Sequence, residues 1–302
     1  MIREYTLLKV IFPAILLCFS CKGSDSRESS RDASVIGWGD NSKNQINIPK
    51  NLEGVIKVVA GDYHTVALLK NGTVITWGDN FQSQLEMPSD LSDISDVAAG
   101  PNFTLALKSN GTVIGWGNNI YKQIDIPKDL TDVISISAGM YYGLALKNDG
   151  TVVLWGTTFP TQIKVPEDLK NVKAISAGSG SFLALKSDGT VATVGTTNFL
   201  LPEGVSGVVQ ISSGGQHSAI LLNDGTVYAW GRSDYGETSV PEGLKGVVSI
   251  YTGATGMAAL KSDGTLVIWG FNSLYEIPKG LSEVTSVALG VDYTIVVGKI
   301  NR

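Results

Sequence analysis

VIKVVAGDYHTVALLKNGTVITWGDNFQSQLEMP, residues 55–88, is the stretch that decides the fold of this chain. Residues 55–60 and 64–69 are apolar runs rich in β-branched residues, a composition typical of short strands. Asn71-Gly72 separates the second run from a third at residues 73–77. Asn-Gly between apolar runs is a strong local signal for a hairpin with a two-residue type I′ turn. The stretch therefore predicts three antiparallel strands in succession.

The same stretch ends in a fourth apolar segment. Residues 85–87 form this short segment, and Pro88 follows it directly. A proline cannot donate a hydrogen bond to a neighbouring strand, so it is tolerated at the edge of a sheet. We therefore expect residues 85–87 to form an outer strand, which gives each unit four strands.

This stretch is one copy of a unit that recurs with a period of 39 residues. A glycine after Trp or Val ends each third strand: Gly39, Gly78, Gly117, Gly156, Gly195, Gly231 and Gly270. A second glycine ends each first strand: Gly61, Gly100, Gly139, Gly178, Gly214, Gly253 and Gly290. A proline closes each copy: Pro49, Pro88, Pro127, Pro166, Pro202, Pro241 and Pro278. Seven copies of a strand-rich unit predict an all-β repeat fold.

Four-stranded units repeated seven times predict a seven-bladed β-propeller over residues 32–302, with a linear β array as the alternative. The two ends of the repeat region favour the closed ring. Residues 284–289 and 293–297 supply the first two strands of a last unit, and residues 32–38 supply its third. A closed ring needs such complementary ends, whereas an open array does not. We therefore expect the N- and C-terminal strands to close the last blade together.

The first 31 residues have the pattern of an export signal and a tether. Residues 1–20 begin with basic residues and continue with an apolar run too short to span a bilayer, which needs about 20 apolar residues. Ser20-Cys21 resembles the lipobox of bacterial lipoproteins, although Cys18 stands where a branched residue or Leu is usual. The resemblance implies a lipidated Cys21, a polar tether over residues 21–31, and a place in the bacterial cell envelope, either periplasmic or surface-exposed. Without lipidation the chain would be secreted.

Composition and motifs give little evidence for a catalytic, metal or cofactor site. A net charge of −5 argues against a nucleic-acid partner, which requires a basic face. No cysteine follows Cys21, which excludes a disulfide or a thiolate zinc site beyond it, and no Gly-Lys-Ser or Gly-Lys-Thr phosphate motif is present. His64 and His217 share one repeat position with Phe103 and Tyr142, so we interpret it as a packing position. We expect no cofactor, no metal ion and no catalytic residue.

Residues 59–68, 71–74 and 77–80 resemble a repeat of the regulator of chromosome condensation family. The resemblance covers residues 32–302. Short blades, Val-Pro or Ile-Pro segments and a split last blade make the chain most similar to bacterial members such as β-lactamase inhibitory protein II. The resemblance implies a propeller that grips a protein through one loop rim. The eukaryotic name-giver is a guanine-nucleotide exchange factor with longer blades and a protruding hairpin, for which 39-residue blades leave no room.

The direction of the strands places the loop after each second glycine and the loop after each Trp-Gly on the same rim. Aromatic residues recur in these loops: Tyr63, Phe81, Tyr121, Tyr141, Phe159, Phe199, Tyr235 and Tyr275. Exposed aromatic residues would mark a protein-binding face, and packing between blades is the alternative. Another position in the loop after Trp-Gly holds Gln or Glu, which indicates framework hydrogen bonds: Gln45, Gln84, Gln123, Gln162, Glu237 and Glu276.

These observations predict a non-enzymatic, monomeric propeller that is displayed on the cell envelope as a lipoprotein. We expect it to bind an unidentified protein partner through the aromatic rim, and to contact the membrane through the lipid anchor alone. Three alternatives stay open: an inhibitor of an extracytoplasmic enzyme, an enzyme with carboxylates at the mouth of the central channel, and a nucleotide exchange factor. The enzyme hypothesis requires acidic groups with perturbed pKa values at that mouth.

Overall fold

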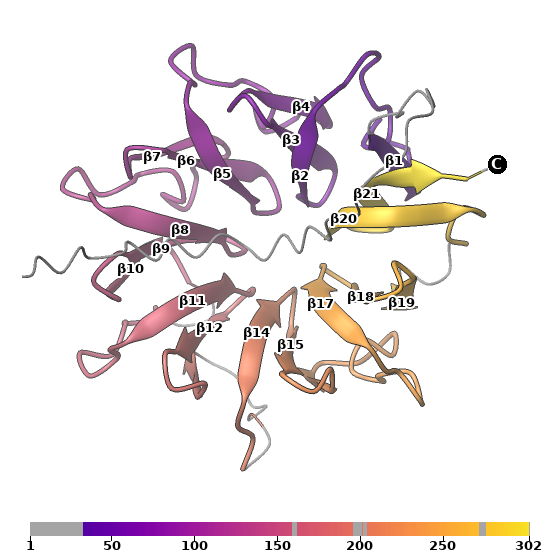
Figure 1. Ribbon diagram of the computed structural model, residues 1–302. Coiled ribbons are helices and arrows are strands. Elements are labelled where there is room, and N and C mark those ends of the chain that lie inside the picture. The colour runs from indigo at the N-terminus through magenta and orange to yellow at the C-terminus, as the bar shows by residue number, and fades with distance from the viewer. Residues whose placement is uncertain (1–32, 159–161, 196–200, 202–203, 272–275, 302) are drawn as a thin grey trace, which may run out of the picture. The chain divides into compact units, whose positions relative to one another are not determined.

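Seven three-stranded antiparallel sheets are arranged around a common centre in the computed structural model, which describes residues 33–158, 162–195, 201, 204–271 and 276–301 (Figure 1). The inner strands are β2 (Val55–Ala60), β5 (Ile94–Ala99), β8 (Val133–Ala138), β11 (Val172–Ala177), β14 (Val208–Ser213), β17 (Val247–Thr252) and β20 (Leu281–Leu289). The middle strands are β3 (His64–Leu69), β6 (Phe103–Lys108), β9 (Tyr142–Lys147), β12 (Ser181–Lys186), β15 (His217–Leu222), β18 (Gly256–Lys261) and β21 (Tyr293–Ile300). The outer strands are β4 (Val74–Gly78), β7 (Val113–Gly117), β10 (Val152–Gly156), β13 (Val191–Gly195), β16 (Val227–Gly231), β19 (Leu266–Gly270) and β1 (Ser34–Gly39). The predicted seven-bladed β-propeller is confirmed.

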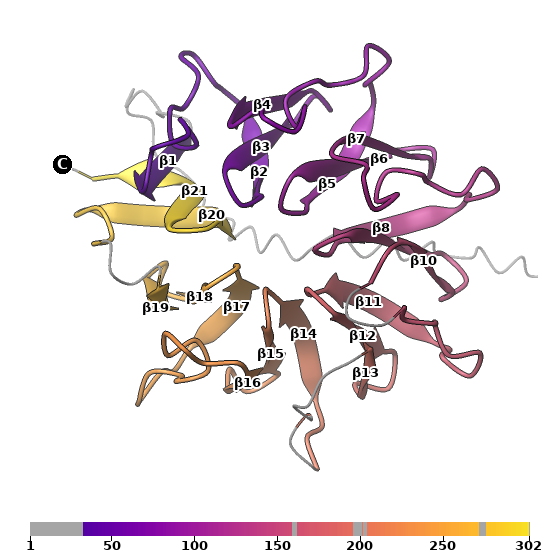
Figure 2. The ribbon, with the colours of Figure 1, turned by 180° about the vertical axis from the view of Figure 1, so that it is seen from behind.

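The ring closes as the complementary chain ends predict. β1 pairs with β21 in antiparallel register from Ser34 opposite Gly298 to Gly39 opposite Tyr293, so the N-terminal strand is the outer strand of the last blade (Figure 1). Seen from behind, β1 again lies beside β21 (Figure 2). A hydrogen bond of 3.0 Å from the backbone N–H of Val58 to Ser286 Oγ joins the first blade to the last.

The predicted fourth strand does not form, so each described blade has three strands. In residues 85–87 the backbone N–H groups are already used by local turns. Leu85 N–H donates to Asn80 Oδ1 at 2.9 Å, Glu86 N–H to the Ser83 carbonyl at 3.1 Å, and Met87 N–H to the Leu85 carbonyl at 3.0 Å. A segment whose donors are engaged in this way cannot pair with the edge of β4.

The hairpin between the middle and outer strands is real, but its turn differs from the predicted type I′. Gly72 has a φ of +80°, whereas Asn71 has no positive φ. Gly72 N–H donates to the Leu69 carbonyl, and Leu69 N–H donates to the Thr73 carbonyl, both at 2.9 Å. This pattern describes a three-residue loop in which a type I turn is followed by a left-handed glycine. The Asn71 side chain accepts a hydrogen bond of 3.0 Å from Thr73 N–H, which explains the Asn or Asp before the glycine.

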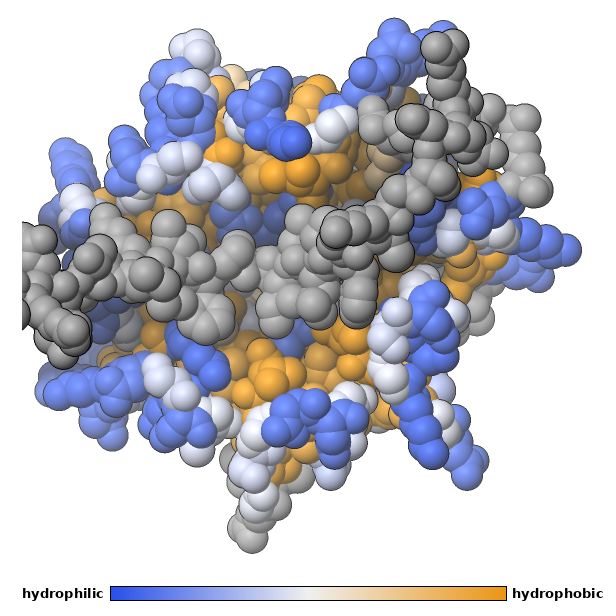
Figure 3. All heavy atoms as spheres, viewed as in Figure 1, coloured by the Kyte–Doolittle hydropathy of each residue, from blue (hydrophilic) through white to orange (hydrophobic). Residues whose placement is uncertain are grey.

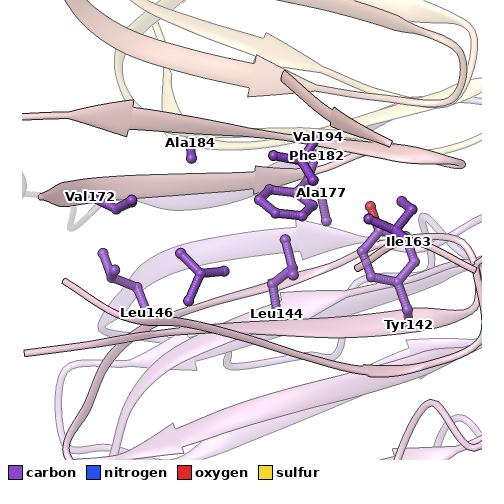
Figure 4. Packing of buried hydrophobic residues seen from close by; sticks show 10 residues of the cluster. Tyr142, Leu144, Leu146, Ile163, Val172, Ala177, Phe182, Ala184 and Val194 are labelled. Atoms are coloured by element: carbon purple, nitrogen blue, oxygen red, sulfur yellow. The ribbon is translucent and has the colours of Figure 1, made fainter. Parts of the chain in front are cut away.

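The hydrophobic core lies between neighbouring blades. The middle strands are buried over most of their length because each has a sheet partner on both sides and a blade packed against each face. Figure 4 shows Leu144 and Leu146 of β9 facing Phe182 of β12 and Val172 of β11 across such an interface. Fully burying one such leucine stabilises the fold by about 1.5–3 kcal/mol. Packing against both neighbours therefore makes the blades depend on one another.

A bulge at the second residue of most inner strands leaves that residue exposed. The pairing of β2 with β3 shifts between Val55 and Lys57, and Ile56 is left 51% exposed. The same position is 52–53% exposed in three other blades, where it holds Ile134, Val209 and Val248. On the face seen in Figure 3, apolar surface lies toward the centre of the ring and polar side chains gather at its outer edge.

Candidate functional site

The two loop types predicted to share a rim do so. Asp79 N–H, just after β4, donates to the carbonyl of Tyr63, just before β3, at 2.9 Å. Thr157 N–H donates in the same way to the Tyr141 carbonyl at 3.0 Å. We call the loop after an inner strand, such as residues 61–63, an inner loop. The loop after an outer strand, such as residues 79–87, is an outer loop, and the two kinds together form the loop rim.

Three of the four Gln residues in the outer loops form the expected framework, whereas Gln162 is exposed and donates to the Gly156 carbonyl instead. Gln84 is completely buried; its Oε1 accepts from Gln82 N–H at 2.7 Å, and its Nε2 donates to Asp79 Oδ2 at 3.0 Å. Gln45 and Gln123 make the equivalent pairs with Asp40 and Asn118. These bonds hold the shape of each loop.

Glu237 holds the same position as these Gln residues, and its loop carries a matching change. Glu237 Oε2 accepts from Tyr235 N–H at 2.9 Å, as the Gln residues do from their own loops. The residue after the Trp-Gly pair is here Arg232 in place of Asp or Asn. The negative charge of Glu237 is one of the causes that raise the pKa of Arg232, after the larger contributions of Asp234. In this loop the Glu is therefore accompanied by a cation.

Four of the repeated Trp residues, Trp77, Trp116, Trp155 and Trp269, fasten an outer loop to the next blade. Trp116 Nε1 donates to the Gln84 carbonyl at 3.1 Å, and Trp155 Nε1 donates to the Gln123 carbonyl at 2.9 Å. Each bond runs from one blade to the loop that leaves the blade before it. The repeated Trp and Gln residues therefore act together, because their hydrogen bonds hold the loop rim at a fixed position on the core.

His64 and His217 are buried at blade junctions, which agrees with the predicted packing position. His64 Nε2 lies 3.1 Å from Thr104 Oγ1 of the next blade, and burial lowers the pKa of His64 to about 4. Tyr293, at the same repeat position, donates from its hydroxyl to the His64 carbonyl at 2.7 Å across the point where the ring closes. These side chains connect neighbouring blades.

The predicted aromatic residues fall into three groups. Phe81, Tyr121 and Tyr235 are exposed, at 85%, 41% and 55% respectively. Tyr63 and Tyr141 in the inner loops are half-buried. Phe159, Phe199 and Tyr275 lie outside the residues that the structure describes, as does Cys21. The two alternatives, exposure and packing, therefore each apply to part of the set.

Neighbouring aromatic side chains on the rim form two pairs. The rings of Tyr121 and Tyr141, one from an outer and one from an inner loop, have centroids 4.3 Å apart. The Tyr235 ring meets Phe271 edge to face at 5.0 Å. Sequence reasoning missed Phe271, and also Ile120, which is 74% exposed beside Tyr121. The signal for Phe271 was its apolar character at a position that other copies fill with polar residues, and the signal for Ile120 was that it stands at the position of Phe81.

The inner strands converge on the centre of the ring (Figure 1). The residues at their ends line a cavity of about 130 Å³. Its walls are the last residue of each inner strand and the first residues of the inner loops, which are mostly alanine and glycine. Asp62 is the one ionisable residue among those that line it. Burial raises the pKa of Asp62 to about 6. The enzyme hypothesis required acidic groups here, and the cavity lining provides this single carboxyl.

Two further carboxylates lie near Asp62 at the junction of the last blade with the first. Asp40 N–H donates to the Asp292 carbonyl at 2.8 Å. Burial raises the pKa of Tyr63, and the charges of Asp62, Asp292 and Asp40 raise it further. Hydrogen bonds from Ser42 and Gln45 keep the pKa of Asp40 below its usual value, so this carboxylate is charged at neutral pH. This sector of the rim is acidic.

The described part of the chain contains no cluster of three or more His, Cys, Asp or Glu residues suited to a metal ion. Among the same residues, no helix is long and apolar enough to cross a membrane.

Three segments match the model of the regulator of chromosome condensation (RCC1) repeat: residues 55–84, 94–123 and 208–237. The chain carries RCC1 repeats. Each match begins at the first residue of an inner strand and ends at the Gln or Glu position of the outer loop. One RCC1 repeat is therefore one blade together with the framework residue that fastens its loop to the next blade. A search of curated proteins finds no significant match.

Solved propellers share this fold, among them yeast RCC1 (Prp20). Prp20p of Saccharomyces cerevisiae, studied for its binding to Gsp1p and histones, has a TM-score of 0.75 at 19% identity over 91% of this chain and 93% of that one. Human WBSCR16 has a TM-score of 0.74 at 20% identity, covering 89% and 99% of the two chains. The CRINKLY WD40 ectodomain of the Arabidopsis thaliana receptor kinase ACR4 has a TM-score of 0.62 at 24% identity, covering 78% and 88%. These matches do not test the lipoprotein signal or the likeness to β-lactamase inhibitory protein II, and both stay predictions.

Proposed function

We propose that this RCC1-repeat propeller is a binding module that captures a protein partner with its loop rim. The observation that carries the proposal is the exposure of large apolar side chains on a rigid rim: Phe81, Ile120 and Tyr235 are 85%, 74% and 55% exposed. Exposed apolar residues that gather on one face are typical of interaction sites, and aromatic anchors supply much of the binding energy there. Because Gln and Trp hold the loops, little conformational entropy is lost when a partner binds.

The similar propellers with known partners support binding as the function. Yeast Prp20p was studied with Gsp1p and histones, and its complex with Kap60 has been solved. At 19% identity these partners are not carried over to this chain. One class of partner that fits the proposal is an extracytoplasmic enzyme, which the rim would inhibit. Guanine-nucleotide exchange on a GTPase has the least support among the functions considered.

We further propose that the propeller is displayed on the cell envelope through a lipid on Cys21. The support is the N-terminal signal pattern and the position of Ser20-Cys21 directly after its apolar run. Metabolic labelling with a fatty acid should mark the wild-type chain and not Cys21→Ala. Equal labelling of the two chains would remove the anchor from the proposal.

The rim is tested with a triple variant, Phe81→Ala, Tyr121→Ala and Tyr235→Ala. Affinity capture from the native envelope should recover a partner with the wild-type chain and lose it with this variant, while the thermal unfolding midpoint stays within a few degrees. A matched control replaces Ile56, Ile134 and Val209 with Ala. These inner-strand residues are 51–53% exposed but lie at the start of their strands, away from the loop rim. Capture of the same partner by the rim variant would refute the proposal.

Catalysis at the channel mouth is a second candidate, supported only by the raised pKa of Asp62. A carboxyl that titrates near neutral pH suits a general acid. No second ionisable group lines the described cavity to act with it. If hydrolase or lyase activity were found and Asp62→Asn removed it, catalysis would replace binding as the function.

A further inference from the structure

The mouth of the central channel is lined mostly by alanine and glycine, whereas the loops around it carry aromatic side chains. Its cavity of about 130 Å³ is several times larger than the roughly 10–15 Å³ that a single water molecule needs. The walls carry short apolar groups, including Ala60, Ala99, Ala138 and Ala177. A long side chain from outside could therefore enter without displacing any side chain of the propeller.

The backbone around the mouth is held by hydrogen bonds between neighbouring inner loops. Asp62 N–H donates to the Pro101 carbonyl of the next blade at 3.1 Å, and Val291 N–H of the last blade donates to the Asp62 carbonyl at 3.2 Å. Farther round the ring, Ser179 N–H donates to the Gly215 carbonyl at 3.0 Å. The main chain that carries Asp62 is thus fixed on both sides.

The carboxyl group of Asp62 has no partner of its own. Among the described residues it forms neither a hydrogen bond nor a salt bridge, although its surroundings are partly dehydrated. Asp292 and Asp40 lie in the same sector, where their charges act on Tyr63 together with that of Asp62. A partly buried carboxylate without a partner destabilises the folded state, and a cation placed beside it would remove that penalty.

From this geometry we propose that the channel mouth receives a lysine or arginine side chain of the bound protein, with Asp62 as its counter-ion. The alanine walls suit the methylene stem of such a side chain, and the carboxylate suits its charged end. The partner would then combine apolar residues, which cover Phe81 and Tyr121, with one protruding basic residue. This inference rests on the proposed function, because it places the cation within the same protein interface.

The inference can be tested without knowing the partner. The probes are the N-acetyl, N-methylamide derivatives of lysine, arginine and norleucine, of which the last is the neutral analogue of lysine. They are titrated into the full chain labelled with ¹³C at the Asp carboxyl and Met methyl groups. The lysine or arginine amide should shift the Asp62 carboxyl signal and the signal of Met140, which lines the same cavity, in a saturable way. The norleucine amide should not.

Two variants sharpen this test. Asp62→Asn should weaken binding of the cationic amides at least about tenfold, read from the Met140 signal, because it removes a charge-assisted hydrogen bond. Asp292→Asn is the matched control, since Asp292 is a nearby carboxylate that does not line the cavity, and it should keep binding within about threefold. Unchanged binding to Asp62→Asn, equal binding of norleucine, or no saturable shift for either cation would overturn the inference.

The results also separate this inference from the proposed function. If the wild-type chain captures a partner through the rim but neither cationic amide binds, the function stands and the inference fails. If the amides bind but the triple rim variant still captures its partner, the aromatic rim is wrong and the cation subsite stands.

Discussion

Replacing Gly100 with Ala should destabilise the propeller because the added methyl group would collide with one identified side chain. A Cβ atom at Gly100 would lie 2.1 Å from Cε1 of Phe103 and 2.7 Å from both Cδ1 and Cζ of the same ring. Phe103 is fully buried, so its ring has no free space into which to move. Overpacking of this kind costs about 1–3 kcal/mol. The side chain three residues later thus explains this glycine in four blades, at Gly61, Gly100, Gly139 and Gly290, whereas a Cβ at Gly214 or Gly253 would first meet atoms of the next blade.

A double-mutant cycle isolates this contact. Phe103→Ala alone should cost about 3–5 kcal/mol because it leaves a cavity. Once the ring is gone the methyl group has room, so Gly100→Ala should cost little more in that background. The double variant should then be more stable than the sum of the two single changes predicts, by about 1–3 kcal/mol. The free energy of unfolding is measured by urea denaturation, followed by both circular dichroism and Trp fluorescence.

Gly54→Ala is the control for this cycle, because a Cβ there meets nothing within 4 Å. Its φ of +69° makes alanine unfavourable by about 1–2 kcal/mol for a purely local reason. That loss should be the same with and without Phe103. If the losses from Gly100→Ala and Phe103→Ala add to within about 0.5 kcal/mol, the packing explanation of the glycine marker is wrong.

Three further predictions concern the loops and the ring closure. Tyr293→Phe should lower the free energy of unfolding by about 1 kcal/mol, since it removes the hydroxyl that donates to the His64 carbonyl. Tyr142→Phe loses the equivalent 2.8 Å bond to the Ser181 carbonyl and should cost a similar amount in the same urea assay. Gln84→Glu should cost about 1–3 kcal/mol at pH 7, because the new carboxylate faces that of Asp79. Glu237→Gln should cost less than half as much, and equal losses would contradict the role of Arg232 as a companion of Glu237. Asp62→Asn should stabilise the chain by about 1–3 kcal/mol at pH 7. The folded pKa of about 6 lies above the ordinary 3.8, so the wild-type carboxylate costs stability above pH 6, and this cost disappears as the pH falls toward 3.8. A stability gap that stays constant from pH 7 to pH 4 would show that Asp62 is not dehydrated.

The repeated positions could be predicted because the same physical demand recurs in each blade. Asn71-Gly72 and its equivalents mark a hairpin even though the turn proved to be type I with a left-handed glycine, since both turn types favour Asn or Asp before Gly. The segment at residues 85–87 was wrongly predicted to be a fourth strand. Its apolar residues fit a strand, but its backbone N–H groups donate to Asn80 Oδ1 and to the Ser83 carbonyl, and hydrophobicity does not reveal such competition.

The candidate site was only partly predictable because it depends on residues that do not repeat. The common rim followed from strand direction, and the Gln framework followed from its regular spacing. The exposure of Phe81 and the half-buried position of Tyr141 did not follow, since each is set by the neighbouring loop. Asp62 received no attention from sequence reasoning, because one aspartate in an inner loop has no distinctive pattern.

The sequence by itself determined the 39-residue period, the number of blades and the closure of the ring, because repeated glycine, tryptophan and proline positions impose the same local packing seven times and the chain ends complement each other. Only the tertiary structure decided which aromatic residues reach solvent and that Asp62 stands alone at the channel mouth. The physical reason is that the exposure of a side chain and the hydration of a carboxyl depend on groups from other blades. Closure of the ring brings those groups together from positions far apart in the chain.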